Sequence, residues 1–428
     1  MKVHFFHLAP AAYFLFIIFP RTLNLPYVTP TEDHPHSDGA LPIGWNGIYH
    51  SCTMHSLIVS DHSNLFPRLK NGVRIHPTSD GSAVFVGLPH RGLLVSGAEH
   101  IPVIRRFDGR TDLAQLAQLA AHLGPASQEL HNLVNHLISE NLIDLHEEPI
   151  SDLGQGVALT FASEQLEPEL VLASWRHGVT DSGRAELTNR AACAILILGS
   201  NRLALTLHSL LLAIGFTQTK LVAGDRNFLP GGYSVARERI TARDICGLTV
   251  RLSDIGMNKR DFLSKTGALH HSDRTRPSDN PDDEVSFPSS PDLIITTEIA
   301  QPDYVQRWMS ESTPYLQVSP MIESWIEVGP LVLPGKSPCL RCVRLHRTRQ
   351  CEWEPSLNLP QFTEPANELP AAAVALLAGV LAMQVSEFSA YDSSPLIGCT
   401  IRYNLHDACK PEHIYWQPHS LCGCMEVI

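Results

Sequence analysis

Basic residues are scarce in this chain. Lysine and arginine together number 32 against 44 aspartates and glutamates, which gives a formal net charge of −12. A phosphate backbone requires a basic protein face, so this balance excludes a general nucleic-acid binder. A basic peptide, or a small anion held in a local pocket, remains compatible with the charge.

Cysteine is also sparse, with 10 residues in a chain of 428. So few cysteines over this length exclude a disulfide framework, and thiols kept free favour a reducing compartment. We therefore expect a cytoplasmic protein. Hydrophobic residues make up 44% of the chain, enough to bury a full core, and the length predicts two or three domains.

Long uninterrupted apolar runs are scarce in the sequence. The run from Leu8 to Pro20 has the length of a signal-peptide core and is too short for a transmembrane helix. We expect residues 1–63 to form an apolar or disordered tail, and translation to start near Met54. A membrane anchor is the alternative if the apolar run is retained. The later apolar segment 369–392 is too interrupted to require a membrane.

Residues 64–150 predict a small domain. Two short strands, SAVFVGL and GLLVSG, flank Pro89 and form a hairpin. Two amphipathic helices follow, the first capped by Thr111, and the strand-like NLIDL ends the pattern. We expect a winged-helix-like domain that holds a peptide at a strand edge or in a helix groove. A helical packing cap on the next domain is the alternative. We expect residues 151–190 to form a connector to the next domain.

Residues 191–428 predict an α/β domain with a doubly wound, Rossmann-like sheet. Ala194 to Leu198 is a continuous apolar run, as expected for a strand buried on both faces of a parallel sheet. Gly199 makes the turn into a helix, and Lys220 to Ala223 begins the next strand. A ligand would lie at the carboxyl ends of such strands. Residues 256–291, which are polar and rich in proline and serine, predict a long mobile insertion.

Two tight cysteine pairs give the sharpest chemical signal. Cys339 and Cys342 form a C-x-x-C, and Cys422 and Cys424 form a C-x-C near the C-terminus. Together they supply the four thiolates of a closed structural zinc site, which would clamp the intervening helix and strand to the domain. The alternatives are a redox C-x-x-C or unrelated free thiols. His419, three residues before Cys422, is the histidine that could replace a cysteine ligand.

These segments carry a family resemblance. Gly199 after a buried strand, the DIGMNK segment ending at Lys259, PDLIITTE, PGKSPCLRC and the terminal cysteine pair occur in the order used by the ThiF/MoeB/ubiquitin-activating superfamily. The chain especially resembles bacterial ThiF-type proteins of modified-peptide biosynthesis, of the azole or cyclodehydratase type. In that group a small winged-helix peptide-binding domain precedes the ThiF-like domain, and residues 71–148 match its place.

The resemblance implies ATP-dependent activation of a carboxylate as an acyl-adenylate, with magnesium as a second cofactor. Gly199 and Asp225 would hold the nucleotide, Asp225 through the ribose. Lys259 falls where the family keeps an ATP-contacting lysine, and Glu298 replaces the aspartate that binds magnesium. We therefore identify Lys259 and Glu298 as the candidate catalytic residues.

The chain also departs from the family pattern. Asn201 and Ala204 stand where the fingerprint has its later glycines, and each adds a Cβ where backbone should approach phosphate or strand. The arginine-bearing, asparagine-rich stretch of the family is not recognisable. Cys351 lacks an oriented base and is not expected to be a nucleophile. His346 and His413 are expected at the surface or behind the metal ligands.

Two functions follow from the resemblance. The first is a module that binds a leader or substrate peptide and presents it to a partner enzyme, a YcaO-type cyclodehydratase, with a degenerate nucleotide site. The second is an active adenylyltransferase that uses Lys259, Asp225 and Glu298 with MgATP. A scaffold whose winged helix binds DNA is disfavoured by the acidic balance. Relatives are commonly dimers, so a homodimer is compatible with either function.

Overall fold

The chain forms two compact units, residues 1–150 and 151–428, each with its own core. The computed structural model describes residues 4–5, 64–97, 99–124, 127–149, 165–222, 239–270, 290–300, 302–350 and 368–425. The apolar run predicted at the N-terminus and Met54 lie outside the described residues.

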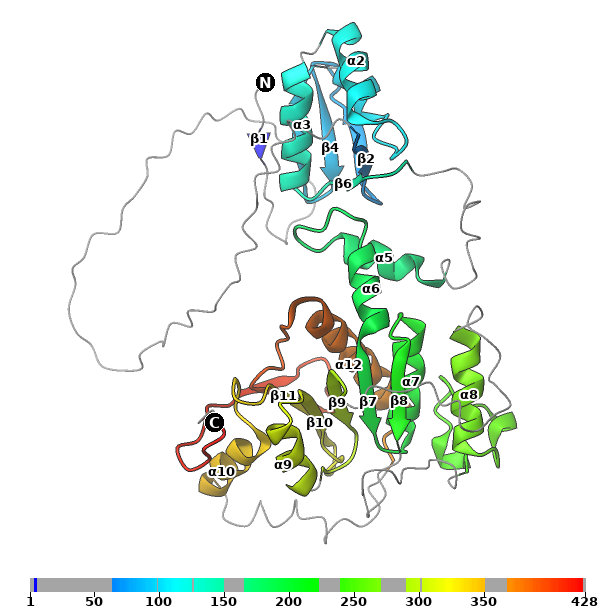
Figure 1. Ribbon diagram of the computed structural model, residues 1–428, viewed down its shortest axis with the longest axis vertical. Helices are drawn as coiled ribbons and strands as arrows, with labels where there is room; N and C mark the ends of the chain where they lie inside the picture. Colours follow the sequence, from blue (N-terminus) through cyan, green and yellow to red (C-terminus); the bar gives the residue numbers. More distant parts are fainter. Residues whose placement is uncertain are drawn as a thin grey trace, which may run out of the picture. The chain divides into compact units, whose positions relative to one another are not determined.

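The first unit combines two small antiparallel sheets with three helices among its described residues (Figure 1). Its elements are β1 (His4–Phe5), β2 (Phe66–Leu69), β3 (Arg74–Pro77), β4 (Ala83–Leu88), β5 (Arg91–Ser96), α1 (His100–Ile104), α2 (Leu113–Leu123), α3 (Ser127–Ser139) and β6 (Ile143–His146). One sheet has the order β1-β5-β4-β3, and β2 pairs with β6 in the other.

The hairpin predicted in this unit is confirmed, because β4 and β5 pair from Ala83 opposite Ser96 to Leu88 opposite Arg91. The predicted cap of α2 is wrong by one residue. Asp112, and not Thr111, accepts a hydrogen bond from the backbone N–H of Gln115 at 2.7 Å. A carboxylate at this position also favours the helix dipole.

The core of the first unit lies between the helices and the β4–β5 hairpin. Apolar side chains alternate on the two strands and recur at helical spacing on α2 and α3, so both patterns converge on one interior. Its most buried members include Val84, Val86, Leu93, Leu116, Leu133 and Leu137.

The second unit is built on a seven-stranded mixed sheet. Its strands are β7 (Ala194–Leu198), β8 (Gln218–Val222), β9 (Leu293–Thr296), β10 (Tyr315–Val318), β11 (Trp325–Val332), β12 (Cys399–Asn404) and β13 (Glu412–Tyr415). Its helices are α5 (Glu167–Ser174), α6 (Arg184–Ala192), α7 (Arg202–Ala213), α8 (Lys259–His270), α9 (Pro302–Ser310), α10 (Leu340–Gln350) and α12 (Ala371–Tyr391), with short 3-10 turns η3 (Ala242–Asp244) and η4 (Leu252–Asp254).

The strand order, β13-β12-β11-β10-β9-β7-β8, confirms the predicted α/β class with a parallel-rich sheet. β8, β7, β9 and β10 run parallel, and the remaining strands extend the sheet in antiparallel fashion. The predicted strand Ala194–Leu198 is confirmed, and β8 begins at Gln218, two residues before the predicted Lys220. Since β8 and β9 flank β7 on opposite sides, the strand order reverses beside β7, where ligands bind in doubly wound folds.

The apolar segment after Pro370 forms α12, which packs against α6 and α7 (Figure 1). Among the described residues, α12 is the helix long and apolar enough to cross a membrane, but half of its most apolar window is buried inside the protein. Val374, Leu377 and Leu381 are at most 1% exposed, so its apolar composition is explained by the core that it forms with α7.

The segment predicted as an insertion from Gly256 differs from the structure at its beginning. Residues 259–270 form α8, and Phe262 packs into the main core. The helix was missed because its apolar residues are few and polar ones surround them. Residues 271–289 lie outside the described residues.

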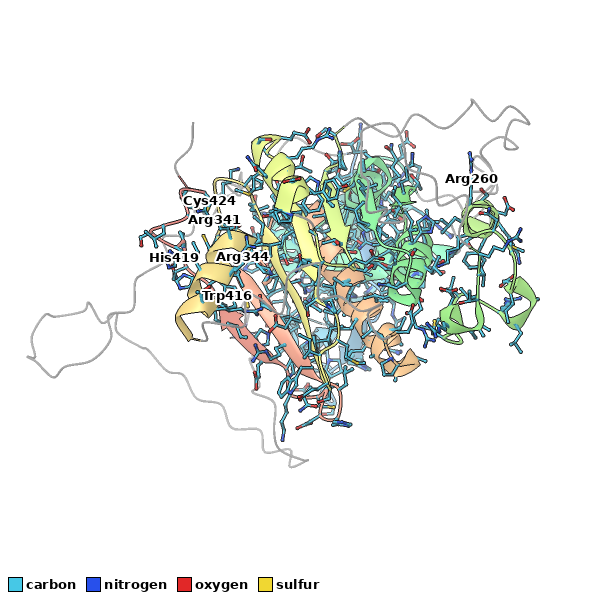
Figure 2. The ribbon with its side chains drawn as sticks, turned by 90° about the horizontal axis from the view of Figure 1, so that it is seen from below. Arg260, Arg341, Arg344, Trp416, His419 and Cys424 are labelled. Carbon is cyan, nitrogen blue, oxygen red and sulfur yellow. The ribbon has the colours of Figure 1, made fainter. Side chains whose placement is uncertain are left out.

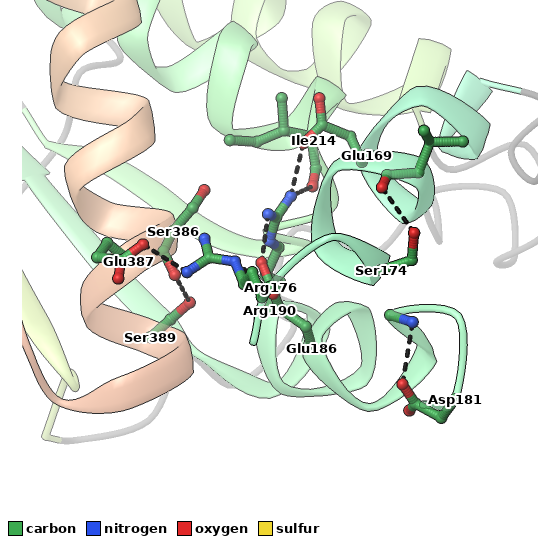
Figure 3. Close-up of polar contacts among 12 residues, drawn as sticks. Glu169, Ser174, Arg176, Asp181, Glu186, Arg190, Ile214, Ser386, Glu387 and Ser389 are labelled. Carbon is green, nitrogen blue, oxygen red and sulfur yellow. Dashed lines mark hydrogen bonds and ion pairs between the residues drawn. The ribbon is translucent and has the colours of Figure 1, made fainter. Parts of the chain in front are cut away.

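A buried ion network joins the helices that precede the sheet (Figure 3). Arg190 on α6 is fully buried and contacts Glu186 at 2.6 Å and Glu169 at 2.8 Å. It also donates to the carbonyl oxygen of Ile214 at 3.1 Å. Arg176 binds the other oxygen of Glu186 at 2.9 Å. The network therefore fixes α5 and α6 to the C-terminal end of α7.

Candidate functional site

The turn after β7 requires glycine. Gly199 has a φ of 133°, and a Cβ built on it would lie 2.1 Å from Oγ1 of Thr297. Such a close approach lets the backbone of β7 turn against the residues that follow β9. The residues of this turn and of the β9 end therefore meet at the carboxyl edge of the parallel strands.

Ser200 is the point at which the candidate catalytic residues converge. Its backbone N–H donates to Oε1 of Glu298 at 3.1 Å, and its carbonyl oxygen accepts from Nζ of Lys259 at 2.7 Å. The Lys259 ammonium also pairs with Oδ1 of Asp244 at 3.3 Å, and both side chains are almost fully buried. Asp244 is held in place by Thr241, whose N–H and hydroxyl both donate to its other oxygen. The Lys259 charge is thus paired with the Asp244 carboxylate and with a backbone carbonyl oxygen.

The N-terminus of α7 is filled by groups of the chain itself. The Asn201 side chain accepts from the backbone N–H of Ala204 at 2.9 Å and donates to the carbonyl oxygen of Thr297 at 3.0 Å. The N–H of Arg202 donates to Oε2 of Glu368 at 3.5 Å, so a carboxylate lies at the positive end of the helix. A helix N-terminus with free N–H groups attracts phosphate. Here the N–H groups of Arg202 and Ala204 already have acceptors, which makes the fit to a nucleotide phosphate poor.

Arg202 and Glu368 are tied to their surroundings. Arg202 donates from Nε to the carbonyl oxygen of Arg243 at 2.7 Å and from Nη1 to that of Leu369 at 3.1 Å. Burial raises the pKa of Glu368, the backbone and charge of Arg202 lower it, and the nearby charge of Asp244 raises it further. The net rise in the pKa of Glu368 means that its ionised form is less favourable here than in water.

The structure brings three of the predicted nucleotide-site residues together. Gly199, Lys259 and Glu298 all lie within contact of Ser200 or its neighbours, whereas Asp225 lies outside the described residues. Sequence reasoning missed Asp244, which pairs with Lys259, and Arg202 and Glu368, which meet at the start of α7. For Asp244 a signal existed: Thr241 and Asp244 have the spacing of a capping box.

The four paired cysteines form a second, separate cluster. Cys339 and Cys342 lie at the start of α10, and the C-terminal turn brings Cys422 and Cys424 against them. The sulfur atoms of Cys339 and Cys422, and of Cys342 and Cys424, are 3.4 Å apart, and all four lie within 4.8 Å of one another. A tetrahedral zinc with bonds of about 2.3 Å needs sulfur atoms about 3.8 Å apart. A disulfide needs about 2.0 Å, so these four cysteines are not disulfide-bonded, and their arrangement fits a metal ion.

The thiol pKa values are shaped by burial and by hydrogen bonds. Burial raises the pKa of Cys339 well above its ordinary range and that of Cys424 to about 11. Burial also acts on Cys342, but the backbone N–H of His419, 3.3 Å from its sulfur, and the neighbouring thiols outweigh it and lower its pKa. A divalent cation between the four sulfurs would deprotonate all of them, since a coordinating thiol loses its proton outright.

The histidines near this cluster have other partners. His419 is buried, and its Nδ1 accepts from the backbone N–H of Leu421 at 3.1 Å, outside the four-sulfur group. His346 contacts the carbonyl oxygen of Gln417 at 2.9 Å and packs edge-on against His419. His413 is exposed on β13. Cys351 lies outside the described residues.

Comparison of the sequence with protein-family models and with curated proteins finds no match. Among solved structures, the chain is similar to MccB of E. coli solved with ATP, at 14% identity and a TM-score of 0.53, over 84% of this chain and 99% of that one. The same values hold for the microcin C7 biosynthetic enzyme MccB in complex with N-formylated MccA. PaaA is similar at 17% identity and a TM-score of 0.53, over 81% of this chain and 100% of that one. At such identities the likeness shows the fold, and the chain has the fold of these proteins.

Proposed function

We propose that this protein is a ThiF-like member of a modified-peptide pathway that binds a leader or substrate peptide and presents it to a partner enzyme. Its nucleotide site does not support adenylation. The proposal draws on the fold shared with MccB, which has been solved with the peptide MccA. The partner is a YcaO-type cyclodehydratase, the cysteine cluster holds structural zinc, and the protein acts in the cytoplasm.

One observation carries the non-adenylating half of the proposal. The Glu368 carboxylate lies at the N-terminus of α7, 3.5 Å from the N–H of Arg202. An incoming phosphate would have to displace this carboxylate or accept its repulsion, because both anions seek the same helix end. Asn201 occupies the N–H of Ala204 in the same turn, and Lys259 is paired with Asp244. These groups, which would otherwise be available to phosphate, are therefore engaged.

The peptide-binding half is supported by the first unit. β5 forms one side of the β4–β5 hairpin, and its outer edge accepts β1 in antiparallel register, with His4 opposite Leu94 and Phe5 opposite Leu93. This edge is thus competent to bind an extended segment through main-chain hydrogen bonds. The hairpin and the helices of this unit share one apolar core, which supports a separate peptide-binding domain.

An active adenylyltransferase is the second candidate. It is favoured by the meeting of Lys259 and Glu298 at Ser200, beside the strand where the sheet order reverses. MccB has been solved with ATP on the same fold. In this case Lys259 would leave Asp244 to contact the phosphates, and Glu298 would hold magnesium.

Titration calorimetry of MgATP into the full, zinc-loaded chain separates the two candidates. We expect no binding at concentrations up to about 1 mM, and measurable binding by Glu368→Gln, because that substitution removes the competing charge. Lys259→Ala is the control for the site. Micromolar binding by the unaltered chain that Lys259→Ala abolishes would establish the adenylyltransferase and overturn the proposal.

Peptide binding is tested separately with a displayed random-peptide library panned against the full, zinc-loaded chain. We expect enrichment of a shared motif, and dissociation constants in the micromolar range for synthetic copies of the enriched peptides. A folded, metal-loaded chain that enriches no motif would contradict the peptide-binding function, whatever the outcome with MgATP.

A further inference from the structure

A pocket of about 510 Å³ lies beside the cysteine cluster in the second unit. Residues of α9, α10, β10 and β11 line it, together with Cys339, Cys422 and Cys424. Val305, Met309 and Val343 give it an apolar lining. The volume lies within the usual range of ligand sites, about 300 to 1,000 Å³. The four-cysteine cluster borders this space, and the residues around Ser200 do not line it.

Three arginines of α10 line the pocket at a spacing of three residues: Arg341, Arg344 and Arg347. Arg347 pairs with Glu327 at 2.5 Å, and Arg402 binds the same carboxylate at 2.7 Å. Burial raises the pKa of Glu327, but these two guanidinium groups outweigh it, and the net shift is downward. The acid that lines the pocket is therefore ionised and already neutralised by two cations.

Arg341 and Arg344 differ from Arg347. Both are exposed at the pocket, and neither forms an ion pair with any acid in the described part of the chain. Figure 2 shows both at α10, close to Cys424 and far from Arg260 at the other end of the unit. In a protein with a net charge of −12, two such guanidinium groups beside an apolar pocket mark a local site for negative charge.

We propose that this arginine pocket, defined by Arg341, Arg344 and the apolar wall of Val305, Met309 and Val343, binds an acidic segment of the peptide substrate. The inference rests on the proposed peptide-binding function and names the chemistry of the bound segment. Guanidinium groups bind carboxylates through paired, charge-assisted hydrogen bonds, and the apolar wall accepts a neighbouring aliphatic or aromatic side chain. The bound segment therefore carries acidic residues with apolar residues near them.

The arginines have one competing role. A zinc centre with four thiolates carries a formal charge of −2, which nearby cations would offset. If Arg341 and Arg344 served only this purpose, their reversal would release the metal and leave peptide affinity unchanged wherever zinc is retained. The metal content of each variant therefore has to be measured beside its peptide affinity.

The test uses fluorescence anisotropy with the full, zinc-loaded chain. The probe is a short fluorescein-labelled peptide in which leucine alternates with glutamate, and its control has lysine in place of glutamate. We expect the acidic probe to bind and the basic one not to bind. Arg341→Glu and Arg344→Glu should each weaken binding by about tenfold or more, and Arg344→Lys by a few-fold, because lysine lacks the bidentate fork. Added salt should weaken binding as well.

Arg260→Glu is the matched control, since it makes the same charge change on an exposed arginine away from the pocket. It should leave the dissociation constant unchanged. Equal affinity for both probes, an unchanged dissociation constant in both α10 variants, or a loss of zinc that accounts for the whole effect would overturn the inference. Library-selected peptides could bind with an affinity that substitution of Arg341 and Arg344 does not change. That result would contradict the arginine pocket as a peptide site and would still support the peptide-binding function.

Discussion

At the scale of single residues, Gly199 sets the geometry of the candidate site. Its φ of 133° is open to glycine and disfavoured for other residues, and a Cβ there would lie 2.1 Å from Oγ1 of Thr297. Through this close approach the turn after β7 meets the end of β9. The positions of Ser200 and Glu298 depend on it.

Gly199→Ala should lower the free energy of unfolding of the second unit by about 2 to 4 kcal/mol, because a disfavoured φ and a steric overlap act together. Gly379→Ala is the matched control. Gly379 lies inside α12, and a Cβ there meets nothing within 4 Å. It should be neutral or stabilising by up to about 1 kcal/mol. Chemical denaturation of both variants measures the difference, and equal effects would refute the close-approach argument.

Glu368 should make stability depend on pH. Burial raises its pKa above the ordinary value, so its ionisation is costlier in the folded state than in the unfolded state. The destabilisation is absent below the unfolded pKa of 4.5 and is fully present above the folded pKa. Glu368→Gln should therefore stabilise the chain near neutral pH by less than about 1 kcal/mol, since the group is partly exposed.

The measurement is the unfolding free energy of the unaltered chain and of Glu368→Gln as a function of pH. The two curves should converge as the pH falls below the ordinary range of glutamate titration. A difference that stays constant across this range would show that the substitution acts through packing and not through the charge at the end of α7.

At the scale of elements, the fold and the site differ in how far the sequence predicts them. Ala194–Leu198 and the β4–β5 hairpin follow from local patterns, a continuous apolar run and two strands around a tight turn. The cysteine pairs likewise carry their spacing in the sequence. Glu368 carries no such signal, because its partner Arg202 lies 166 positions away and the contact exists only in the folded chain. The start of α8 was missed because its few apolar residues are surrounded by polar ones.

The ion network of Arg190 should control the packing of α5 and α6. Arg190→Met keeps most of the side-chain volume but leaves the buried Glu186 carboxylate without its partner on the same helix. Loss of one member of a buried pair costs about 3 to 5 kcal/mol, and this loss should appear as a lower transition temperature in calorimetry. The double variant Arg190→Met with Glu186→Leu should recover part of it, because the buried Glu186 carboxylate is removed, while Glu169 and Arg176 each still lose one partner. A double variant that is as unstable as the single one would show that Arg190→Met destabilises the protein through lost packing and not through the unpaired carboxylate.

At the scale of the whole molecule, the two units have separate apolar cores. One core lies between α2, α3 and the β4–β5 hairpin, and the other surrounds the large sheet and α12. The four-cysteine cluster belongs to the second unit alone. Because binding energy of a structural metal is folding energy, it should act on one unit and not on the other.

Scanning calorimetry of the full chain should therefore resolve two transitions, of which one depends on metal. Cys342→Ser should reduce the zinc content and lower that transition, since it removes a ligand from the cluster. Cys409→Ser is the control, because Cys409 is exposed and lies outside the four-sulfur group. It should change neither the zinc content nor either transition.

Leu116→Ala assigns the remaining transition. Leu116 is fully buried in the core of the first unit, and its truncation costs about 2 to 5 kcal/mol. We expect Leu116→Ala to lower the temperature of the transition that Cys342→Ser does not affect. The temperature of the metal-dependent transition should not change. If both substitutions move the same transition, the two cores unfold as one cooperative body. Unchanged zinc content in Cys342→Ser would instead show that the four sulfurs are not metal ligands.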